Sequence, residues 1–193
     1  MTHLNKDQKR RELIKLLQQK AYRKGDFTLS SGRKSEHYVN CKPVTLNGWG
    51  LKLASSLMLD LIDEDAVAVG GLTLGADPLV SAVAMMSYQT WRPLDALIIR
   101  KTPKGHGTQS QVEGPLPPKG AKIAVLEDVT TTGASALLAV DVCRELGYNV
   151  ERVVTIVDRK NYEPFLWHDH DLELKSLFTL DDIKSRNQAH VRT

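Results

Sequence analysis

The sequence predicts a single α/β domain with a central, mostly parallel β-sheet that is flanked by helices. From residue 66 onward, short apolar runs that suit strands alternate with stretches of helical periodicity. The runs are continuously apolar, as expected for parallel strands that are buried on both faces. The chain has 193 residues, of which 41% are hydrophobic, so it is long enough for one core.

The first third of the chain predicts two helices with a polar segment between them. Residues 7–22 place leucines, an isoleucine and an alanine among charged side chains, which is the pattern of an amphipathic helix. Residues 25–48 are rich in glycine, serine and threonine, and they predict short strands and turns that form a covering segment over another part of the protein. Residues 51–62 carry leucines at a spacing of four and predict the second helix.

The rest of the chain supplies the sheet. The predicted strands are residues 66–70, 95–100, 122–128, 151–158 and, less regularly, 172–178. Helices are expected near residues 76–87 and from about Ser135 to Leu146, where Gly147 would end the second of them. Ligands in such folds bind at the carboxyl ends of the strands, which is where residues 127–135 fall.

Residues 100–121 form a long connection without apolar periodicity. A structureless loop of this length is uncommon in a compact domain unless it acts as a lid or a binding loop. It begins with four basic side chains, Arg100, Lys101, Lys104 and His106. Such a cluster can bind a polyanion such as pyrophosphate, whereas the plainer alternative is a solvated basic loop. Two glycines among these residues and the length of the loop favour a lid.

Bulk composition excludes several classes of protein. A formal net charge of +3 is too small to indicate a nucleic-acid-binding surface. The two cysteines, Cys41 and Cys143, imply no disulfide framework, and they are expected to be reduced packing residues. The first residues are too charged for a secretory signal, and glycines, Asp77 and Pro78 interrupt the most apolar stretch. We therefore expect a cytoplasmic protein with no membrane span.

The stretch EDVTTTGAS, residues 127–135, carries the strongest chemical signal. A turn from a strand into a helix N-terminus presents free N–H groups that attract a phosphate, and Gly133 lets the backbone close around it. Neither GxxxxGK[ST] nor GxGxxG is present. Glu127 and Asp128 suit hydrogen bonds from vicinal hydroxyls, so the pattern favours a ribose 5-phosphate ligand. The alternative is that the two acids cap the helix or bind a surface lysine.

The same stretch resembles the phosphoribosyl-pyrophosphate (PRPP) signature of the type I phosphoribosyltransferases. Residues 100–107, RKTPKGHG, resemble the mobile catalytic loop of the orotate phosphoribosyltransferases in that family. Residues 25–38 resemble their N-terminal hood segment, and residues 70–79 resemble their pyrophosphate-side loop. Arg159 matches their orotate-binding arginine. The resemblance spans roughly residues 20–180.

The resemblance implies a type I phosphoribosyltransferase fold in one domain, residues 1–193. A small N-terminal hood would span about residues 22–48, with Ser31, Gly32 and Tyr38 in it, and the catalytic loop would span about residues 100–120. The hood would cover the base. The active unit would be a homodimer in which the catalytic loop is shared across the interface.

The resemblance also assigns site residues. The implied PRPP-binding residues are Arg100, Lys101, Lys104, His106, Glu127, Asp128, Val129, Thr130, Thr131, Thr132, Gly133, Ala134 and Ser135. Among them, Lys101, Lys104, His106 and Asp128 would be catalytic. Thr131 and Arg159 would bind orotate, since a guanidinium pairs bidentately with a carboxylate. Mg²⁺ would arrive with PRPP, and no metal is expected to be held by the protein alone; His168 and His170 are read as surface residues rather than a zinc pair.

The implied activity is transfer of ribose 5-phosphate from PRPP to orotate. Two alternatives stay open on the sequence: a transferase for another base, and a non-catalytic regulator that binds PRPP on the same fold. Some members of the family carry lysines where this chain has Ser30 and Leu74. Fewer cations are therefore available for pyrophosphate, and the contacts that replace them are not evident from the sequence.

Overall fold

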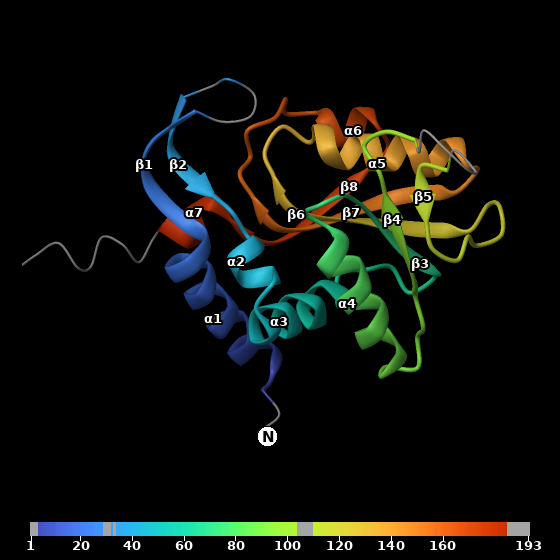
Figure 1. The fold of residues 1–193 in the computed structure, drawn as a ribbon, viewed down its shortest axis with the longest axis horizontal. Helices are drawn as coiled ribbons and strands as arrows, with labels where there is room; N and C mark the ends of the chain where they lie inside the picture. Colours follow the sequence, from blue (N-terminus) through green and yellow to red (C-terminus); the bar gives the residue numbers. More distant parts are fainter. Residues whose placement is uncertain (1–3, 29–31, 33, 104–109, 185–193) are drawn as a thin grey trace, which may run out of the picture.

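The computed structural model describes residues 4–28, 32, 34–103 and 110–184 (Figure 1). The larger of its two sheets contains β3 (Ala68–Leu72), β4 (Asp95–Ile99), β5 (Val112–Glu113), β6 (Lys122–Thr130), β7 (Asn149–Asp158) and β8 (Glu173–Thr179). Their order is β5-β4-β3-β6-β7-β8, and every pair is parallel except β4 with β5. The predicted mostly parallel sheet is confirmed.

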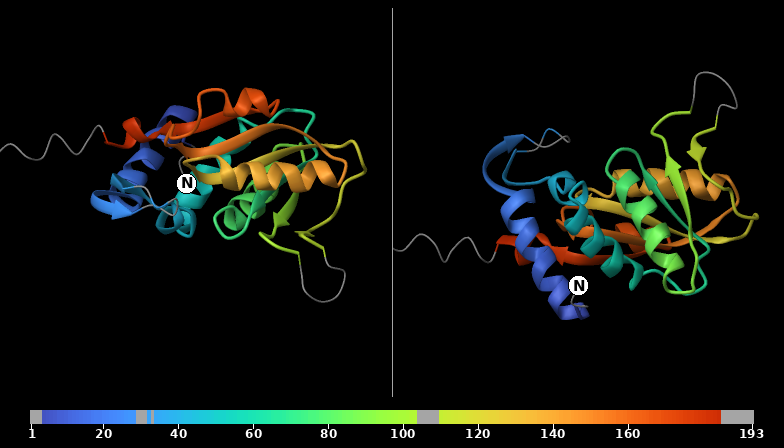
Figure 2. Two further views of the ribbon diagram at one scale, coloured as in Figure 1. Left: turned by 90° about the horizontal axis from the view of Figure 1, so that it is seen from above. Right: turned by 60° about the horizontal axis from the view of Figure 1, so that its bottom comes forward.

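Helices cover both faces of this sheet. One core cluster joins it to α1 (Lys6–Leu16), α3 (Gly48–Leu59) and α4 (Asp77–Tyr88), and the other joins it to α5 (Ala134–Glu145) (Figure 2). The side chains of β6 alternate between the two: Ala124 and Leu126 belong to the first cluster, and Ile123 and Val125 to the second. This alternation sets the directions in which the acids that follow in β6 point.

A separate two-stranded sheet forms the hood hairpin. Its strands are β1 (Tyr22–Thr28) and β2 (Lys34–Val39), which pair antiparallel, and the short α2 (Lys42–Thr45) follows them. The hairpin stands beside the main sheet (Figure 1). It begins where the chain leaves the first helix, so the hood is attached to the core on both sides, through Tyr22 and through Val39, which are opposite each other in register.

The structure corrects several predicted boundaries. The expected helix over residues 7–22 is α-helical to Leu16, continues as the π-helical turn η1 (Leu17–Ala21), and ends where Tyr22 pairs with Val39. Long-range strand pairing thus overrides the helical pattern at its end. The connection over residues 100–121 is not structureless throughout, because β5 pairs with the end of β4. Two residues are too few to show a periodic pattern in the sequence.

Two further short helices were not predicted. They are α6 (Leu166–Asp169) and α7 (Leu180–Lys184), of four and five residues. Each has fewer than two helical turns, so no repeating apolar stripe marks it in the sequence. Among the described helices, none is long and apolar enough to cross a membrane.

The close approach of β3 to α4 and β6 predicts a stability effect at Gly71. A Cβ atom there would lie 2.3 Å from the Cβ of Ala76 and 2.8 Å from the backbone oxygen of Leu126. We expect Gly71→Ala to lower the free energy of unfolding by about 1–3 kcal/mol, because neither neighbour is a flexible side-chain end. Thermal denaturation measures this as a fall of roughly 2–4 °C per kcal/mol.

Gly48→Ala is the matched control, because a Cβ atom at Gly48 meets nothing within 4 Å. It should leave the melting temperature unchanged or raise it slightly. Equal melting temperatures for the two variants would contradict the packing argument.

Candidate active site

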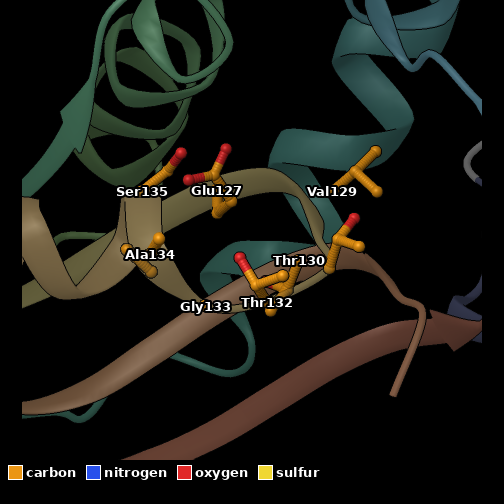
Figure 3. A pocket seen from close by; sticks show the side chains of 9 residues that line it. Glu127, Val129, Thr130, Thr132, Gly133, Ala134 and Ser135 are labelled. Atoms are coloured by element: carbon orange, nitrogen blue, oxygen red, sulfur yellow. The ribbon is translucent and has the colours of Figure 1, made fainter. Parts of the chain in front are cut away.

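A phosphate-sized pocket lies at the carboxyl end of β6. It is lined by Glu127 and by residues 129–136, and it joins the last residues of β6 to the first turn of α5 (Figure 3). Gly133 is the residue before α5 and has a φ of 83°, the left-handed conformation that glycine adopts without strain. No side chain caps α5 at this position, so the amides of its first turn are free to bind an anion.

The strand is two residues longer than predicted. β6 continues to Thr130, whereas the sequence placed its end at Asp128. Pairing with β7 extends it, since Val129 and Thr130 pair with Val157 and Asp158. Both acids therefore belong to a paired strand rather than to a loop, and their backbone is fixed by the sheet.

The loop is supported from behind by α6. A Cβ atom on Gly133 would lie 2.6 Å from Leu166 and 3.2 Å from the indole of Trp167. Trp167 packs edge-on against Tyr162, with ring centroids 5.4 Å apart, and the Tyr162 hydroxyl donates to Asp158 Oδ2 at 2.9 Å. The segment after β7 thus supports residues 131–135, which are the predicted phosphate loop. This contact was not predicted, because only His168 and His170 were considered in that region and no local pattern links Trp167 to Gly133.

Glu127 is buried and faces the pocket. It is 7% exposed, and its Oε2 has no hydrogen-bond partner among the described residues. Burial raises the pKa of Glu127 well above its usual range, and the neighbouring Asp128 raises it further. The hydroxyl of Thr130 is likewise buried without a partner. Figure 3 shows the Glu127 carboxyl group near the Ser135 hydroxyl. Unsatisfied buried polar groups of this kind suit the hydroxyls of a bound ligand.

Asp128 lies beside Glu127 and faces α2 and the loop after β3. It is 8% exposed, and its Oδ1 accepts a hydrogen bond of 2.9 Å from the Val129 amide. Its Oδ2 lies 4.0 Å from Lys42 Nζ. A Cβ atom on Gly75 would lie 2.7 Å from Oδ1, so a glycine is needed there for the loop to approach the acid. The predicted pyrophosphate-side loop therefore lies against the acid pair.

Arg159 connects this end of the sheet to the hood. Its backbone N–H donates to the carbonyl oxygen of Thr130 at 2.9 Å, directly before the phosphate loop. Its Nη2 donates to Ser35 Oγ at 3.2 Å and to the carbonyl oxygen of His37 at 3.0 Å. Burial lowers the pKa of Arg159. The structure thus brings Arg159, Thr130 and hood strand β2 together. No sequence pattern singles out Ser35 or His37 as its partners.

The cations of the long loop are not gathered at the acid pair. Arg100 Nε donates to Glu113 at 3.1 Å, and its backbone N–H donates to Gln111. Because Arg100 follows β4, it lies two strands away from β6 in the sheet. Lys101 is exposed. Four residues that the sequence analysis singled out, Ser30, Ser31, Lys104 and His106, lie outside the described residues.

Two other predicted hood residues, Tyr38 and Gly32, lie in the hairpin. Tyr38 stacks on Phe27 with ring centroids 5.2 Å apart, and Gly32 has a φ of 78°. Both residues therefore belong to the hairpin itself.

The described residues contain no group of three or more histidine, cysteine or acidic side chains that could hold a metal ion. His168 is exposed and lies 3.7 Å from Asp169. The packing prediction for Cys41 and Cys143 is confirmed, since both are fully buried in the two core clusters, and burial raises the pKa of Cys143 to about 12. The carboxylates of Glu127 and Asp128 suit an Mg²⁺ ion whose other ligands are water and phosphate oxygens.

Two proteins with similar sequences are orotate phosphoribosyltransferases. The orotate phosphoribosyltransferase of Thermosynechococcus vestitus is 52% identical over 176 residues, which cover 91% of this chain and 93% of that protein. The orotate phosphoribosyltransferase of Aquifex aeolicus is 42% identical over 178 residues, which cover 90% of this chain and 97% of that protein. No protein-family model matches the chain.

Solved structures agree with these relatives. Mycobacterium tuberculosis orotate phosphoribosyltransferase in complex with Fe(III) dicitrate has a TM-score of 0.78 and 38% identity, covering 91% of this chain and 98% of the other. The same enzyme in complex with PRPP has a TM-score of 0.74 and 35% identity, covering 91% and 99%. The predicted fold class, that of the type I phosphoribosyltransferases, is confirmed by these neighbours together with the sheet topology.

The packing of α6 against the phosphate loop predicts the effect of Gly133→Ala. This change adds the clash with Leu166 to the left-handed strain, which by itself costs about 1–2 kcal/mol. We expect the affinity for ribose 5-phosphate, measured by calorimetry, to fall roughly tenfold or more, which is the equivalent of about 1.4 kcal/mol or more.

Gly120→Ala separates strain from the clash, because Gly120 has nearly the same φ of 82° and nothing within 4 Å of the added atom. It should lose stability without losing affinity. If the two variants bound ribose 5-phosphate equally, the supporting role of α6 would be wrong.

The buried Glu127 predicts a pH-dependent gain of stability in Glu127→Gln. Because the folded-state pKa is raised, the fold loses stability as the pH rises from the unfolded-state pKa through the folded-state pKa. Glutamine removes that loss, so the variant should melt higher than the wild type at about pH 8. The gain should disappear near pH 4, below the usual glutamate pKa of about 4.3.

Glu145→Gln serves as the control, since Glu145 is exposed at the end of α5. It should show no comparable dependence on pH. A wild type that melts higher than Glu127→Gln at pH 8 would contradict the assignment of an unsatisfied buried charge.

Proposed function

The chain belongs to the orotate phosphoribosyltransferase family, and we propose that it transfers ribose 5-phosphate from PRPP to N1 of orotate. The products are orotidine 5′-phosphate and pyrophosphate, in the de novo synthesis of UMP. The observation that carries the proposal is the convergence of three parts in one site: an anion-binding helix N-terminus, a buried acid pair, and an arginine anchored to the hood. This arrangement occurs in a chain that matches orotate phosphoribosyltransferases along nearly its whole length.

The helix N-terminus, the acid pair and Arg159 suit the 5′-phosphate, the ribose and the orotate, respectively. The 5′-phosphate would lie on residues 131–135, where the free amides and the hydroxyls can donate to it. The ribose hydroxyls would donate to Glu127, whose Oε2 has no partner among the described residues, and to Asp128. Arg159 and Thr131 would bind orotate, because a guanidinium suits its carboxylate.

The reaction breaks the bond between the anomeric carbon and the diphosphate oxygen and forms a bond from that carbon to N1 of orotate. Positive charge develops on the sugar, and the buried carboxylates of Glu127 and Asp128 lie where they can stabilise it. Arg100, Lys101, Lys104 and His106 would bind PRPP and neutralise the departing diphosphate. Mg²⁺, when bound, would neutralise charge on the diphosphate as a Lewis acid. No covalent intermediate with the protein is required.

The basic loop would act across a homodimer. Two observations support this: Arg100 lies two strands away from β6 and is engaged at the sheet edge, and several large apolar side chains are exposed on the surface. Leu74, next to Gly75 in the loop after β3, is 69% exposed, and Met85 and Tyr88 are exposed on α4. A partner subunit that covered these side chains would bring its loop to this site. We further propose that the enzyme works in the cytoplasm, which the absence of a membrane-spanning helix in the described part of the chain permits.

The ultraviolet absorbance of orotate tests the reaction directly. We expect the signal to fall only when purified protein, PRPP and Mg²⁺ are all present. Asp128→Asn should lower kcat by roughly 10²–10³-fold, as expected when one preorganised electrostatic contact is removed. Asp141→Asn, at an exposed position of α5, should leave turnover unchanged and controls for the loss of a carboxylate.

Other outcomes would reassign the site. Turnover with adenine, hypoxanthine, xanthine or uracil but not with orotate would identify a transferase for another base. Binding of PRPP without turnover of any base would identify a regulator. Full activity of Asp128→Asn would remove the acid pair from the mechanism.

A further inference from the structure

The acid pair faces a cation that the sequence analysis did not consider. Lys42 is the first residue of α2, and its Nζ lies 4.0 Å from Asp128 Oδ2. Its positive charge also favours the ionised form of Glu127. Lys42 thus opposes both carboxylates of the site, although it comes from the hood rather than from the basic loop.

The backbone of Lys42 is fixed, whereas its amino group is not. Cys41 and Val44 on either side are fully buried, and the Lys42 backbone N–H donates to Asn40 Oδ1 at 3.1 Å. The Lys42 side chain is 43% exposed. A distance of 4.0 Å is too long for a hydrogen bond, so the contact with Asp128 leaves the amino group able to donate to a ligand.

The position of Lys42 points to one part of the substrate. Glu127 lines the pocket at residues 129–136, whereas the neighbouring Asp128 lies against Gly75 and Lys42. Lys42 therefore lies beside the loop after β3, away from the 5′-phosphate. In PRPP the diphosphate is at the opposite end of the ribose from that phosphate. A ligand with its hydroxyls on the acid pair would direct its diphosphate toward Lys42.

The charges of the site also favour binding of the diphosphate near Lys42. Two buried carboxylates repel a polyanionic substrate, and position 74, in the loop that approaches Asp128, carries an uncharged leucine. A nearby ammonium group offsets that repulsion. Resting on the proposed function, we propose that Lys42 is a substrate-binding cation that turns from Asp128 to the diphosphate oxygens of PRPP.

Kinetics and binding of Lys42→Met and Lys42→Arg test this assignment. Lys42→Met should raise KM for PRPP and weaken inorganic pyrophosphate binding by roughly 10–100-fold, the usual effect of losing a hydrogen bond to a charged group. KM for orotate should change little, and Lys42→Arg should restore most of the pyrophosphate affinity. Lys52→Met is the control, because Lys52 is exposed over Trp49 on α3 and its loss removes the same charge.

A second ligand separates a direct contact from an effect through Asp128. If Lys42 only positioned Asp128, Lys42→Met would weaken ribose 5-phosphate as much as pyrophosphate, and the proposal would be overturned. Unchanged pyrophosphate affinity in a folded Lys42→Met, with folding checked by its melting temperature, would overturn it as well. An inactive wild type would contradict the proposed function instead, while the pyrophosphate measurement would still decide the role of Lys42.

Discussion

The burial of β6 on both faces is the constraint on which the site depends. Its alternating side chains belong to two different cores, so a shift by one residue would move each set of side chains into the core that is packed for the other. The same alternation sends Glu127 toward the phosphate pocket and Asp128 toward α2 and Gly75. The register of this strand therefore fixes where each carboxylate of the proposed site lies.

The hood depends on that strand through Arg159. The backbone of Arg159 continues the pairing of β7 with β6, and its guanidinium holds the Ser35 hydroxyl and the carbonyl of His37 in β2. The Tyr22 hydroxyl lies 2.9 Å from His37 Nδ1, which ties the same part of β2 to the start of β1. The side chain that we propose to bind the base is thus part of the contact between hood and sheet, which would couple the proposed base site to the position of the hood.

Stability and function are in conflict at the end of β6. A carboxylate buried without a hydrogen-bond partner, beside a second carboxylate, makes the free protein less stable than a neutral pair would. Binding of a ligand that brings hydroxyls, or a cation with its phosphates, removes that cost. The proposed role of Lys42 fits this balance. Its ammonium group offsets the negative charge of the acid pair in the free protein and could bind the negatively charged diphosphate of the substrate.

The sequence by itself determined the alternation of strands and helices, the small turn at Gly133 and the chemical class of the site. These features are local: apolar runs, a glycine at a left-handed position, and acids at a strand end are all visible over a few neighbouring residues. Tertiary structure alone decided which distant residues meet. Pairing with β7 extended β6 to Thr130, and packing placed Trp167 behind Gly133 and Lys42 opposite Asp128. Such contacts join residues far apart in the chain, and no spacing in the sequence reports them.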